Sequence, residues 1–418
     1  MIQRPRGTFD ILPEEMPYWY KIEETARKVS ALYGFSEIRI PTFEATELFA
    51  RGVGDTTDVV QKEMYTFTDR EGRSLTLRPE GTAGVARALI ENGKCSDAMP
   101  LKLFYIINCF RYEKPQAGRS REFYQYGVEL FGSDSPAADA TVIALANAVI
   151  SRLGITGTEL QVNSIGCPSC RPEYHKKLRE FFAANEEKLC PTCRERLKTN
   201  PLRILDCKNE DCIKLCEGAP KVLDSLCSPC AGHFETLKKY LDASGIAYTV
   251  NPKIVRGLDY YTRTVFEFIS DKIGAQSTIC GGGRYDGLIK QIGGPELPGI
   301  GFAMGITRLI LAMKACGSEV EEPMAPSLYI APLGERAQLY ALKLSAGLKE
   351  AGIYSECDIV GRSLKSQMKY ADKIGAKYTL ILGDAEIDTG RAILKNMQTG
   401  EQSEVGVSDI DALRRLLS

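Results

Sequence analysis

Two long strand-like runs joined by a short polar loop constrain the fold of this chain more than any other feature. The runs are LKLFYIINCFRYE at residues 101–113 and REFYQYGVELF at residues 121–131, and the loop between them is KPQAGRS. Strands joined by so short a connection run antiparallel, because a parallel pair needs a crossover of about a dozen residues or more. The sequence therefore predicts a domain built on an antiparallel sheet.

Polar residues occupy alternating positions in both runs. Side chains alternate between the two faces of a strand, so Arg111 and Glu113 share one face, as do Gln125, Gly127 and Glu129. A face that carries these residues either lines a functional site or meets solvent. The hairpin alone leaves both interpretations open.

Arginines beside glycines recur along the chain, whereas histidine is scarce. Only two histidines occur, His175 and His233, and the glycine motifs of P-loop and dinucleotide-binding folds are absent from the sequence. Many arginines with few histidines suit phosphoryl chemistry, which relies on positioning and charge neutralisation more than on covalent catalysis. Arginine and glycine occur together in the loop 114–120 and in four further segments: TLRPEGTAG (76–84), RGLDYYTRTVFEF (256–268), CGGGRYDGL (280–288) and PGIGFAMGITRLIL (298–311).

The C-terminal part of the chain has a pattern of its own. Residues 317–327, GSEVEEPMAPS, are acidic and contain proline, which is typical of a linker. In residues 328–418, strand-like segments alternate with helix-like segments, and this alternation predicts a small α/β domain.

A basic series lies within this second domain. The whole chain has 53 basic and 54 acidic residues, so a nucleic-acid partner would need a local basic patch. The series places positive charges three or four residues apart, which predicts one helix face. That face suits a phosphate backbone, or it is a solvated surface; the spacing is compatible with both. Its members are Arg362, Lys365, Lys369, Lys373 and Lys377.

The order of seven segments resembles the histidyl-tRNA synthetase family of class II aminoacyl-tRNA synthetases. The resemblance covers nearly the whole chain and implies an α+β fold. It implies a catalytic domain with an antiparallel sheet flanked by helices (1–316), a Cys-rich, mainly helical insert within it (164–250), a linker (317–327), and a C-terminal α/β anticodon-binding domain (328–418). The segments are RGTFDILPEE, EIRIPTFE, TLRPEGTAG, FRYEKPQAGRSREF, RGLDYYTRTVFEF, GGGRYDGL and GFAMGITRL.

The resemblance also implies an activity and the residues that would carry it. L-Histidine and ATP would form histidyl-adenylate and pyrophosphate, and the 3′-end of tRNA(His) would then accept the histidine. Mg²⁺ would bridge the outgoing phosphates, and Arg111 and Arg256 would be catalytic at the α-phosphate. The implied ATP-binding residues are Arg111, Glu113, Arg119, Phe123 and Arg308; the implied histidine-binding residues are Glu80, Thr82, Gln125, Glu129, Arg256, Tyr261 and Tyr285.

The same resemblance implies partners for the chain. A homodimer would form around EIRIPTFE, with Pro41, and tRNA would be the macromolecular partner. One departure from the class II pattern is Thr307, which stands where the third class motif usually has glutamate. The residues implied to contact tRNA are Lys114, Gln116, Arg362, Lys365, Lys369 and Lys373.

Nine of the fourteen cysteines lie between residues 164 and 231. No apolar stretch of signal-peptide or membrane-span length is found, so we expect a cytoplasmic protein with reduced thiols and no membrane association. Zinc prefers four thiolates, and eight cysteines could form two sites. The alternative is a set of small buried residues in an insert that folds without metal. The candidate ligands are Cys167, Cys170, Cys190, Cys193, Cys207, Cys212, Cys227 and Cys230.

Two other functions remain compatible with the motifs. One is a catalytically inactive regulatory relative, such as the synthetase-like subunit of ATP phosphoribosyltransferase. The other is a zinc-stabilised tRNA-binding sensor that does not activate an amino acid. The full C-terminal domain and the three arginines Arg111, Arg256 and Arg308 favour an enzyme.

Overall fold

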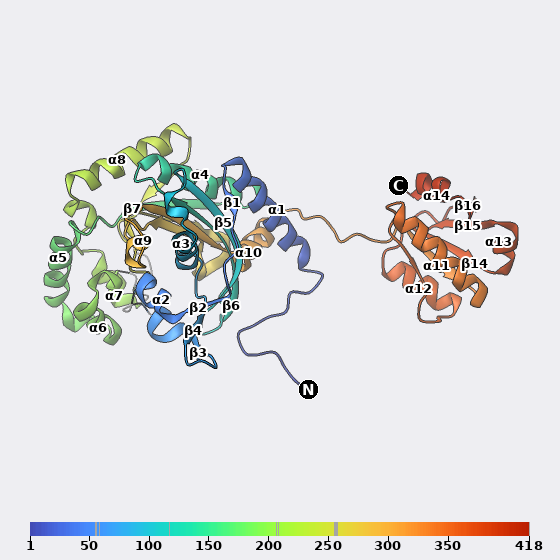
Figure 1. Ribbon diagram of the computed structural model, residues 1–418, viewed down its shortest axis with the longest axis horizontal. Coiled ribbons are helices and arrows are strands. Elements are labelled where there is room, and N and C mark those ends of the chain that lie inside the picture. The colour runs from blue at the N-terminus through green and yellow to red at the C-terminus, as the bar shows by residue number, and fades with distance from the viewer. Residues whose placement is uncertain are drawn as a thin grey trace. The chain divides into compact units, whose positions relative to one another are not determined.

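The computed structural model describes residues 1–54, 57, 59–116, 118–205, 207, 209–254 and 258–417. The chain divides into two compact units, Met1–Glu321 and Glu322–Ser418 (Figure 1). The division falls inside the segment 317–327 that the sequence predicts to be a linker.

The first unit is built on an eight-stranded sheet with the order β1-β5-β6-β11-β10-β9-β7-β8. Its six inner strands pair antiparallel, which confirms the prediction, whereas the short edge strands β1 and β8 pair parallel with their neighbours. The strands are β1 (Ser36–Glu37), β5 (Leu101–Phe110), β6 (Glu122–Phe131), β7 (Thr158–Ser164), β8 (Thr249–Val250), β9 (Thr262–Ser270), β10 (Thr278–Arg284) and β11 (Gly299–Gly305).

The hairpin of β5 and β6 pairs over its whole length, from Leu101 opposite Phe131 to Phe110 opposite Glu122. Strand β5 ends at Phe110, so the expectation that Arg111 and Glu113 lie on a strand face is wrong. The backbone N–H of Arg111 still donates to the carbonyl of Arg121, 2.8 Å away. This bond extends the pairing by one step and holds Arg111 at the mouth of the hairpin.

Helices cover both faces of the sheet (Figure 1). Helix α4 begins at a serine N-cap, because the Ser135 hydroxyl accepts from the Ala137 amide and Pro136 occupies the first turn. Phe104 belongs to the core beneath α1, α4, α8 and α10, and its neighbour Tyr105 to the core on the opposite face, beneath α3 and α9. The helices are α1 (Met16–Leu32), α3 (Thr82–Glu91), α4 (Pro136–Arg152), α8 (Ser228–Ala243), α9 (Leu288–Gln291) and α10 (Ile306–Cys316).

A second, three-stranded sheet with the order β2-β4-β3 contains a hairpin of β3 and β4 whose turn includes Glu71 and Gly72. Its hairpin turn is fixed by Asp69, which accepts from the backbone amides of Glu71 and Arg73. The elements of this region are β2 (Phe43–Ala45), α2 (Thr46–Val53), the π-helical turn Val59–Glu63, β3 (Tyr65–Thr68) and β4 (Ser74–Leu77). Elsewhere in the first unit, the 3₁₀ turn Lys94–Ser96 follows α3, and the 3₁₀ turn Asp271–Gln276 connects β9 to β10.

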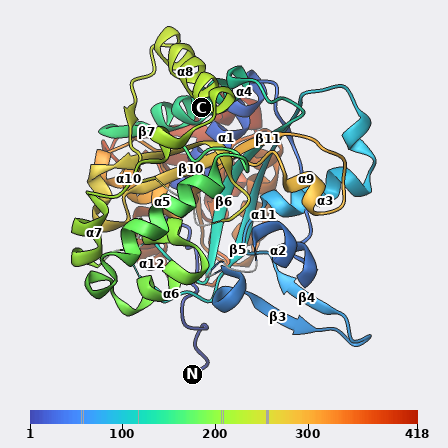
Figure 2. The same ribbon diagram turned by 90° about the vertical axis from the view of Figure 1, so that its left-hand side faces the viewer.

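The Cys-rich insert connects β7 to α8 and is mainly helical (Figure 2). It has a core of its own, in which Tyr174, Leu178 and Phe182 of α5 are buried. Its elements are α5 (Arg171–Ala183), α6 (Pro191–Thr199), α7 (Glu210–Cys216), and the 3₁₀ turns Glu186–Lys188, Pro201–Ile204 and Val222–Ser225.

The second unit has a five-stranded sheet with the order β13-β12-β14-β15-β16. The first three strands pair parallel, as an α/β pattern predicts, and a C-terminal hairpin adds two antiparallel strands. Its elements are β12 (Leu328–Pro332), α11 (Glu335–Glu350), β13 (Ser355–Cys357), α12 (Leu364–Lys373), β14 (Tyr378–Leu382), α13 (Asp384–Thr389), β15 (Arg391–Asn396), β16 (Gln402–Gly406) and α14 (Ile410–Leu417).

Helix α12 carries only part of the predicted basic face. Lys365, Lys369 and Lys373 lie four residues apart on it and are exposed. Arg362 precedes the helix and Lys377 follows it, so placing them on the same helix face is wrong. Arg362 instead pairs with Asp358 at 2.7 Å, and its guanidinium lies 4.2 Å from the centre of the Tyr370 ring. No helix in the described part of the chain has the length and apolar character needed to span a membrane.

Candidate active site

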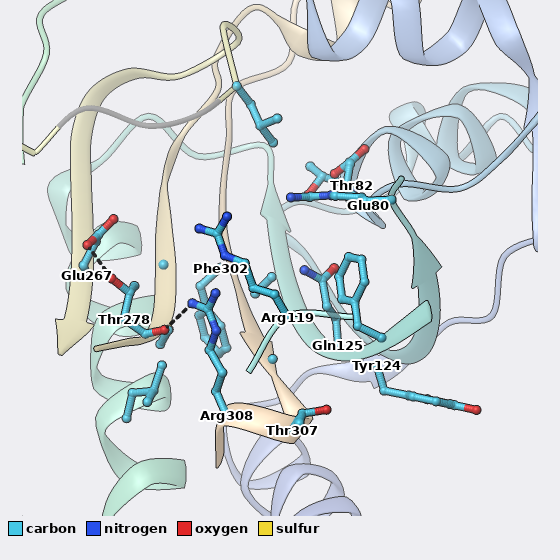
Figure 3. A pocket seen from close by; sticks show the side chains of 18 of the residues that line it. Glu80, Thr82, Arg119, Tyr124, Gln125, Glu267, Thr278, Phe302, Thr307 and Arg308 are labelled. Atoms are coloured by element: carbon cyan, nitrogen blue, oxygen red, sulfur yellow. Dashed lines mark hydrogen bonds between the residues drawn. The ribbon is translucent and has the colours of Figure 1, made fainter. Parts of the chain in front are cut away.

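A pocket of about 440 Å³ opens on the face of the large sheet that α3 covers. In Figure 3, Arg119 and Arg308 point into the same space, with Glu80 and Thr82 on one side of it and Thr278 and Glu267 on the other. The predicted site residues that line this pocket are Glu80, Thr82, Arg111, Glu113, Arg119, Phe123, Gln125, Tyr261, Tyr285 and Arg308. Arg256 lies outside the described residues.

Glu129 of β6 lies behind the pocket wall with 1% of its surface exposed. Its Oε1 accepts from Thr82 Oγ1 at 2.7 Å and from Tyr105 Oη at 3.1 Å, and its Oε2 accepts from the Tyr285 hydroxyl. Burial raises the pKa of Glu129 to about 8, although the hydrogen bonds from Tyr285 and Thr82 act in the opposite direction. The predicted polar face of β6 therefore faces a site and not solvent, and Glu129 can exchange a proton near neutral pH.

Glu80 stands at the start of α3 and is fixed by the helix. Its two carboxylate oxygens accept from the backbone N–H groups of Thr82 and Ala83, each at 2.8 Å. Burial raises the pKa of Glu80, while these hydrogen bonds and the charge of Arg111 oppose the shift. Two buried carboxyls, Glu80 and Glu129, thus share one wall and meet through Thr82.

Glycines make room for this wall. A Cβ atom at Gly81 or Gly127 would overlap the ring of Tyr105, and a Cβ at Gly301 would overlap the carboxylate of Glu129. The absence of side chains at Gly81 and Gly127 allows the Tyr105 ring to lie close to their backbones and reach Glu129, and the absence of one at Gly301 leaves room for the Glu129 carboxylate.

Positive charge gathers at the other end of the pocket. Arg111 donates through Nε to the Pro79 carbonyl at 2.8 Å, and its guanidinium lies 5.3 Å from the centre of the Phe123 ring. Arg119 pairs with Glu113 at 3.1 Å. The aromatic face and the guanidinium forks together form a surface suited to a planar base and its phosphates.

Arg308 of α10 is fixed by two carbonyl groups. It donates through Nε to Gly118 at 3.2 Å and through Nη1 to Thr278 at 2.7 Å. Burial lowers the pKa of Arg308, and the neighbouring charge of Arg119 lowers it further. The positive charges of Arg119 and Arg308 repel one another, so an anionic ligand bound between the two guanidinium groups would be stabilised.

Comparison with known proteins decides the family. A family model described as "Histidyl-tRNA synthetase" matches residues 7–309, and one described as "Anticodon binding domain" matches residues 327–413. The chain belongs to the histidyl-tRNA synthetase family.

Individual relatives agree with this assignment. A histidine–tRNA ligase of Acetivibrio thermocellus is 54% identical over 410 residues, covering 98% of both chains, and one of Halothermothrix orenii is 52% identical over 417 residues, covering 100% of both. Among solved structures, the apo histidyl-tRNA synthetase of S. aureus superposes with a TM-score of 0.83 at 39% identity over 100% of both chains. These matches confirm the resemblance that the sequence motifs suggest.

The name of one similar solved structure includes a regulatory subunit of ATP phosphoribosyltransferase, the alternative function considered from the sequence. An ATP phosphoribosyltransferase regulatory subunit/histidyl-tRNA synthetase from Bacillus halodurans C superposes with a TM-score of 0.65 at 23% identity, covering 89% of this chain and 96% of that one. At this identity the likeness shows the shared fold and leaves the function to be decided by the site.

Three residues that line the pocket, Tyr105, Tyr260 and Glu267, are not among the site residues predicted from sequence motifs. Tyr105 lies in an apolar run and resembles a core residue, and the glycines that make room for its ring, Gly81 and Gly127, are far from it in the sequence. Glu267 could have been found by strand alternation, since it shares a face of β9 with Val265 and bonds to Thr278 at 3.0 Å. Tyr260 packs edge-on against Tyr285 with ring centres 5.6 Å apart.

The residues expected to contact tRNA fall in both units. Lys114 and Gln116 are exposed on the loop that follows β5, beside the pocket residue Arg119. Thr307, the departure from the third class II motif, lines the pocket, and its hydroxyl is buried without a hydrogen-bond partner among the described residues.

Proposed function

We propose that this member of the histidyl-tRNA synthetase family is a histidine–tRNA ligase, and that the pocket binds L-histidine beside ATP. The observation that supports this best is that Tyr285, whose hydroxyl bonds to Glu129 behind the wall, lines the same pocket as the cationic residues Arg111, Arg119 and Arg308. One end thus suits an imidazole and the other a polyphosphate.

The histidine end can satisfy both nitrogens of the ring. A carboxyl and a phenol offer an acceptor and a donor, which is what a neutral imidazole requires. Glu129 and Tyr261, with Tyr285 nearby, would meet the ring, whereas Glu80, Thr82 and Gln125 would receive the ammonium group. An amino acid without the matching groups would leave these buried polar atoms unpaired, which would penalise its binding.

The ATP end supplies stacking and charge. Phe123 would stack on the adenine, which Glu113 would recognise, and Arg308 would cover its other face and reach the γ-phosphate. Arg119 would hold the terminal phosphates. Mg²⁺ prefers oxygen ligands and octahedral geometry, and in such sites it is bound by substrate phosphates, one or two carboxylates and several waters. The pocket carboxylate of Glu267 is a suitable protein ligand for it.

The reaction needs no protein nucleophile. The histidine carboxylate attacks the α-phosphorus of ATP, the bond to the β-phosphate breaks, and pyrophosphate leaves. The 3′-terminal hydroxyl of tRNA(His) then attacks the acyl carbon, AMP leaves, and the hydroxyl proton is released. Arg111, together with Arg256, would neutralise the α-phosphate during the first step, so the protein acts by positioning and electrostatic stabilisation.

The remaining expectations extend this proposal to partners. The second unit would bind the anticodon region with Lys365, Lys369, Lys373 and Arg362, and Lys114 and Gln116 would approach the acceptor end. A homodimer would form around EIRIPTFE, where Phe43 is exposed beside Phe67 with ring centres 6.2 Å apart. The use of tRNA supports a cytoplasmic location, and sedimentation analysis tests the dimer.

Histidine-dependent exchange of pyrophosphate into ATP tests the proposal directly. We expect exchange with L-histidine and none when histidine is omitted or replaced by another amino acid. Aminoacylation of tRNA(His) transcript tests the second step. Tight binding of tRNA(His) without any exchange would instead support the regulatory or sensor alternative.

A further inference from the structure

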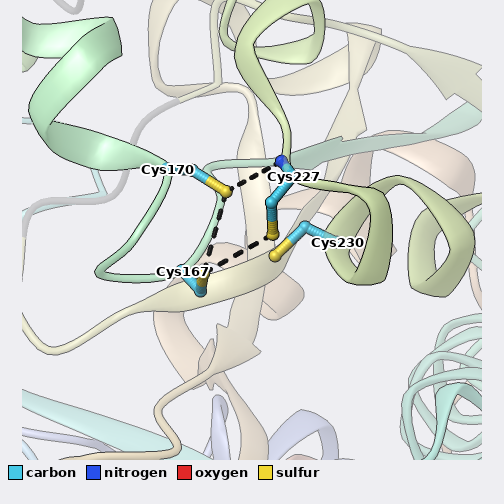
Figure 4. A group of neighbouring side chains, drawn as sticks. All are labelled: Cys167, Cys170, Cys227 and Cys230. Carbon is cyan, nitrogen blue, oxygen red and sulfur yellow. Dashed lines mark hydrogen bonds between the residues drawn. The ribbon is translucent and has the colours of Figure 1, made fainter.

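Eight cysteines of the first unit gather in two groups of four, and in each group the sulfur atoms lie within 4.8 Å of one another. The anchor cluster consists of Cys167, Cys170, Cys227 and Cys230 (Figure 4). The insert cluster consists of Cys190, Cys193, Cys207 and Cys212.

The sulfur separations fit a metal tetrahedron. With Zn–S bonds of ~2.3 Å, the edge of a tetrahedral four-sulfur site is about 3.8 Å. The recorded distances are 3.7 Å between Cys167 and Cys170, 3.9 Å between Cys167 and Cys227, and 3.8 Å between Cys190 and Cys207. A disulfide would require about 2.0 Å, and all fourteen cysteines are free thiols.

Backbone amides point at the sulfur atoms of both clusters. The Cys227 amide donates to Cys170 Sγ at 3.2 Å, and the Cys190 amide donates to Cys212 Sγ at 3.3 Å. Such bonds stabilise negative charge on sulfur, and a metal ligand requires that charge. The two clusters therefore resemble each other in their surroundings as well as in their sulfur arrangement.

The remaining cysteine of the insert provides an internal comparison. Cys216 is buried, donates to the Ile204 carbonyl at 3.5 Å, and belongs to neither cluster. It behaves as a small core residue. If all nine cysteines only filled space, nothing would sort eight of them into two groups of four.

We propose that the two clusters are structural Zn²⁺ sites, each closed by four cysteine thiolates. Four protein ligands leave no position for water or substrate, so neither ion takes part in the ligation reaction. The anchor cluster joins the point where the chain leaves β7 to the point where α8 begins, and it therefore closes the insert at its base.

The anchor cluster also connects to the pocket. Arg171, which follows Cys170, donates a hydrogen bond to the Tyr261 carbonyl. Two backbone bonds of 2.8 Å join Ile165 and Gly166 to Arg263. Tyr261 lines the pocket, so zinc in the anchor cluster would help to hold the histidine wall in place. This consequence rests on the proposed function, whereas the zinc sites themselves do not.

Metal analysis of the full-length protein, purified without chelator, tests the sites. We expect two zinc ions per chain in the wild type, one in Cys230→Ser, one in Cys212→Ser, and none in the double variant. Cys216→Ser is the matched control, because it changes a buried cysteine of the same insert, and it should keep two. Less than one zinc per wild-type chain, or two in either single variant, would overturn the proposal.

A second measurement covers variants that fail to fold. Wild-type protein reconstituted with Co²⁺ should show the intense absorption of tetrahedral cobalt–thiolate centres at two equivalents per chain. Saturation without thiolate absorption would contradict four-sulfur sites.

The connection to the pocket has its own readout. In the exchange assay, Cys230→Ser should raise the KM for histidine about tenfold and change the KM for ATP less. Absence of exchange in the wild type would remove the proposed function and leave the zinc count intact. An unchanged KM for histidine in a variant that has lost one zinc would refute the connection to Tyr261.

Discussion

Arg284 of β10 and Asp139 of α4 form an ion pair that is closed off from solvent, with Nε 2.7 Å from Oδ1 and no exposed surface on either side chain. Asp139 also bonds to His233 at 2.7 Å, and Arg284 bonds to Asp286 at 2.7 Å and to the Ser133 carbonyl at 2.8 Å. The next residue after Arg284 is Tyr285, so this network fixes the backbone from which the tyrosine reaches Glu129.

Removing one partner of that pair should destabilise the first unit. Asp139→Ala removes one of the two carboxylates that pair with the buried Arg284 guanidinium, and breaking a buried pair in this way costs about 3–5 kcal/mol. Urea unfolding followed by fluorescence measures the change. Arg391→Ala, which breaks the exposed pair with Glu404 in the second unit, should change stability by less than ~1 kcal/mol. Equal effects of the two variants would contradict the assigned role.

Glu129→Gln should change how stability depends on pH. The folded protein holds the Glu129 proton up to a pKa of about 8, whereas an unfolded chain releases it near ~4.3. The stability that Glu129 contributes is thus present at acid pH and lost as pH rises through about 8. Glutamine has no such proton, so the free energy of unfolding of the variant should rise relative to wild type by a few kcal/mol between about pH 5 and about pH 9. Parallel pH profiles would contradict the burial of a titrating carboxyl.

Gly127→Ala should disturb the pocket through Tyr105. The added Cβ would overlap the tyrosine ring, and overpacking of this kind costs about 1–3 kcal/mol. In a Tyr105→Ala background the space is open, so the same substitution should have a much smaller effect. Unfolding free energies of the four proteins in this cycle provide the measurement, and additive effects would mean that the ring does not fill the space beside the Gly127 backbone.

Arg256→Ala should abolish amino-acid activation. Loss of one preorganised cationic donor at the α-phosphate should lower the exchange rate by ~10² or more. Arg51→Ala, at an exposed ion pair with Glu47, is the control and should retain the wild-type rate. Unchanged exchange in Arg256→Ala would remove its assigned role.

Replacing Lys365, Lys369 and Lys373 together by alanine should weaken tRNA binding and leave tRNA-independent exchange unchanged. Each lost phosphate contact should also reduce the slope of log K against log salt by about 0.7 to 0.9. Lys343→Ala combined with Lys349→Ala, at exposed positions on α11, is the control. Equal losses in both variants would show that α12 has no special role in tRNA binding.

The elements that could be predicted are those defined by residues close together in the sequence. The β5–β6 hairpin follows from two strand patterns and a short loop, and the eight cysteines of the two clusters are the eight candidate ligands chosen from the sequence. The end of β5 at Phe110 has no such signal, because strand pattern alone does not reveal where pairing with the partner strand stops. The C-terminal hairpin of the second unit is likewise absent from the prediction.

Long-range polar contacts are harder still to predict. Asp139, His233 and Arg284 come from three separate elements, and each by itself resembles an ordinary surface or core residue. Tyr105 resembles an apolar strand residue until the backbones of Gly81 and Gly127 are seen to flank it. These residues can be recognised only when the sheet has brought them together.

The three glycines around Tyr105 and Glu129 also limit how this pocket can be re-engineered. Codon randomisation at Gly81, Gly127 and Gly301 should return glycine among active clones. A larger residue at Gly81 or Gly127 would collide with Tyr105, and one at Gly301 would collide with Glu129. Libraries aimed at histidine analogues would do better to vary Gln125 and Tyr261, whose side chains border open space within the pocket.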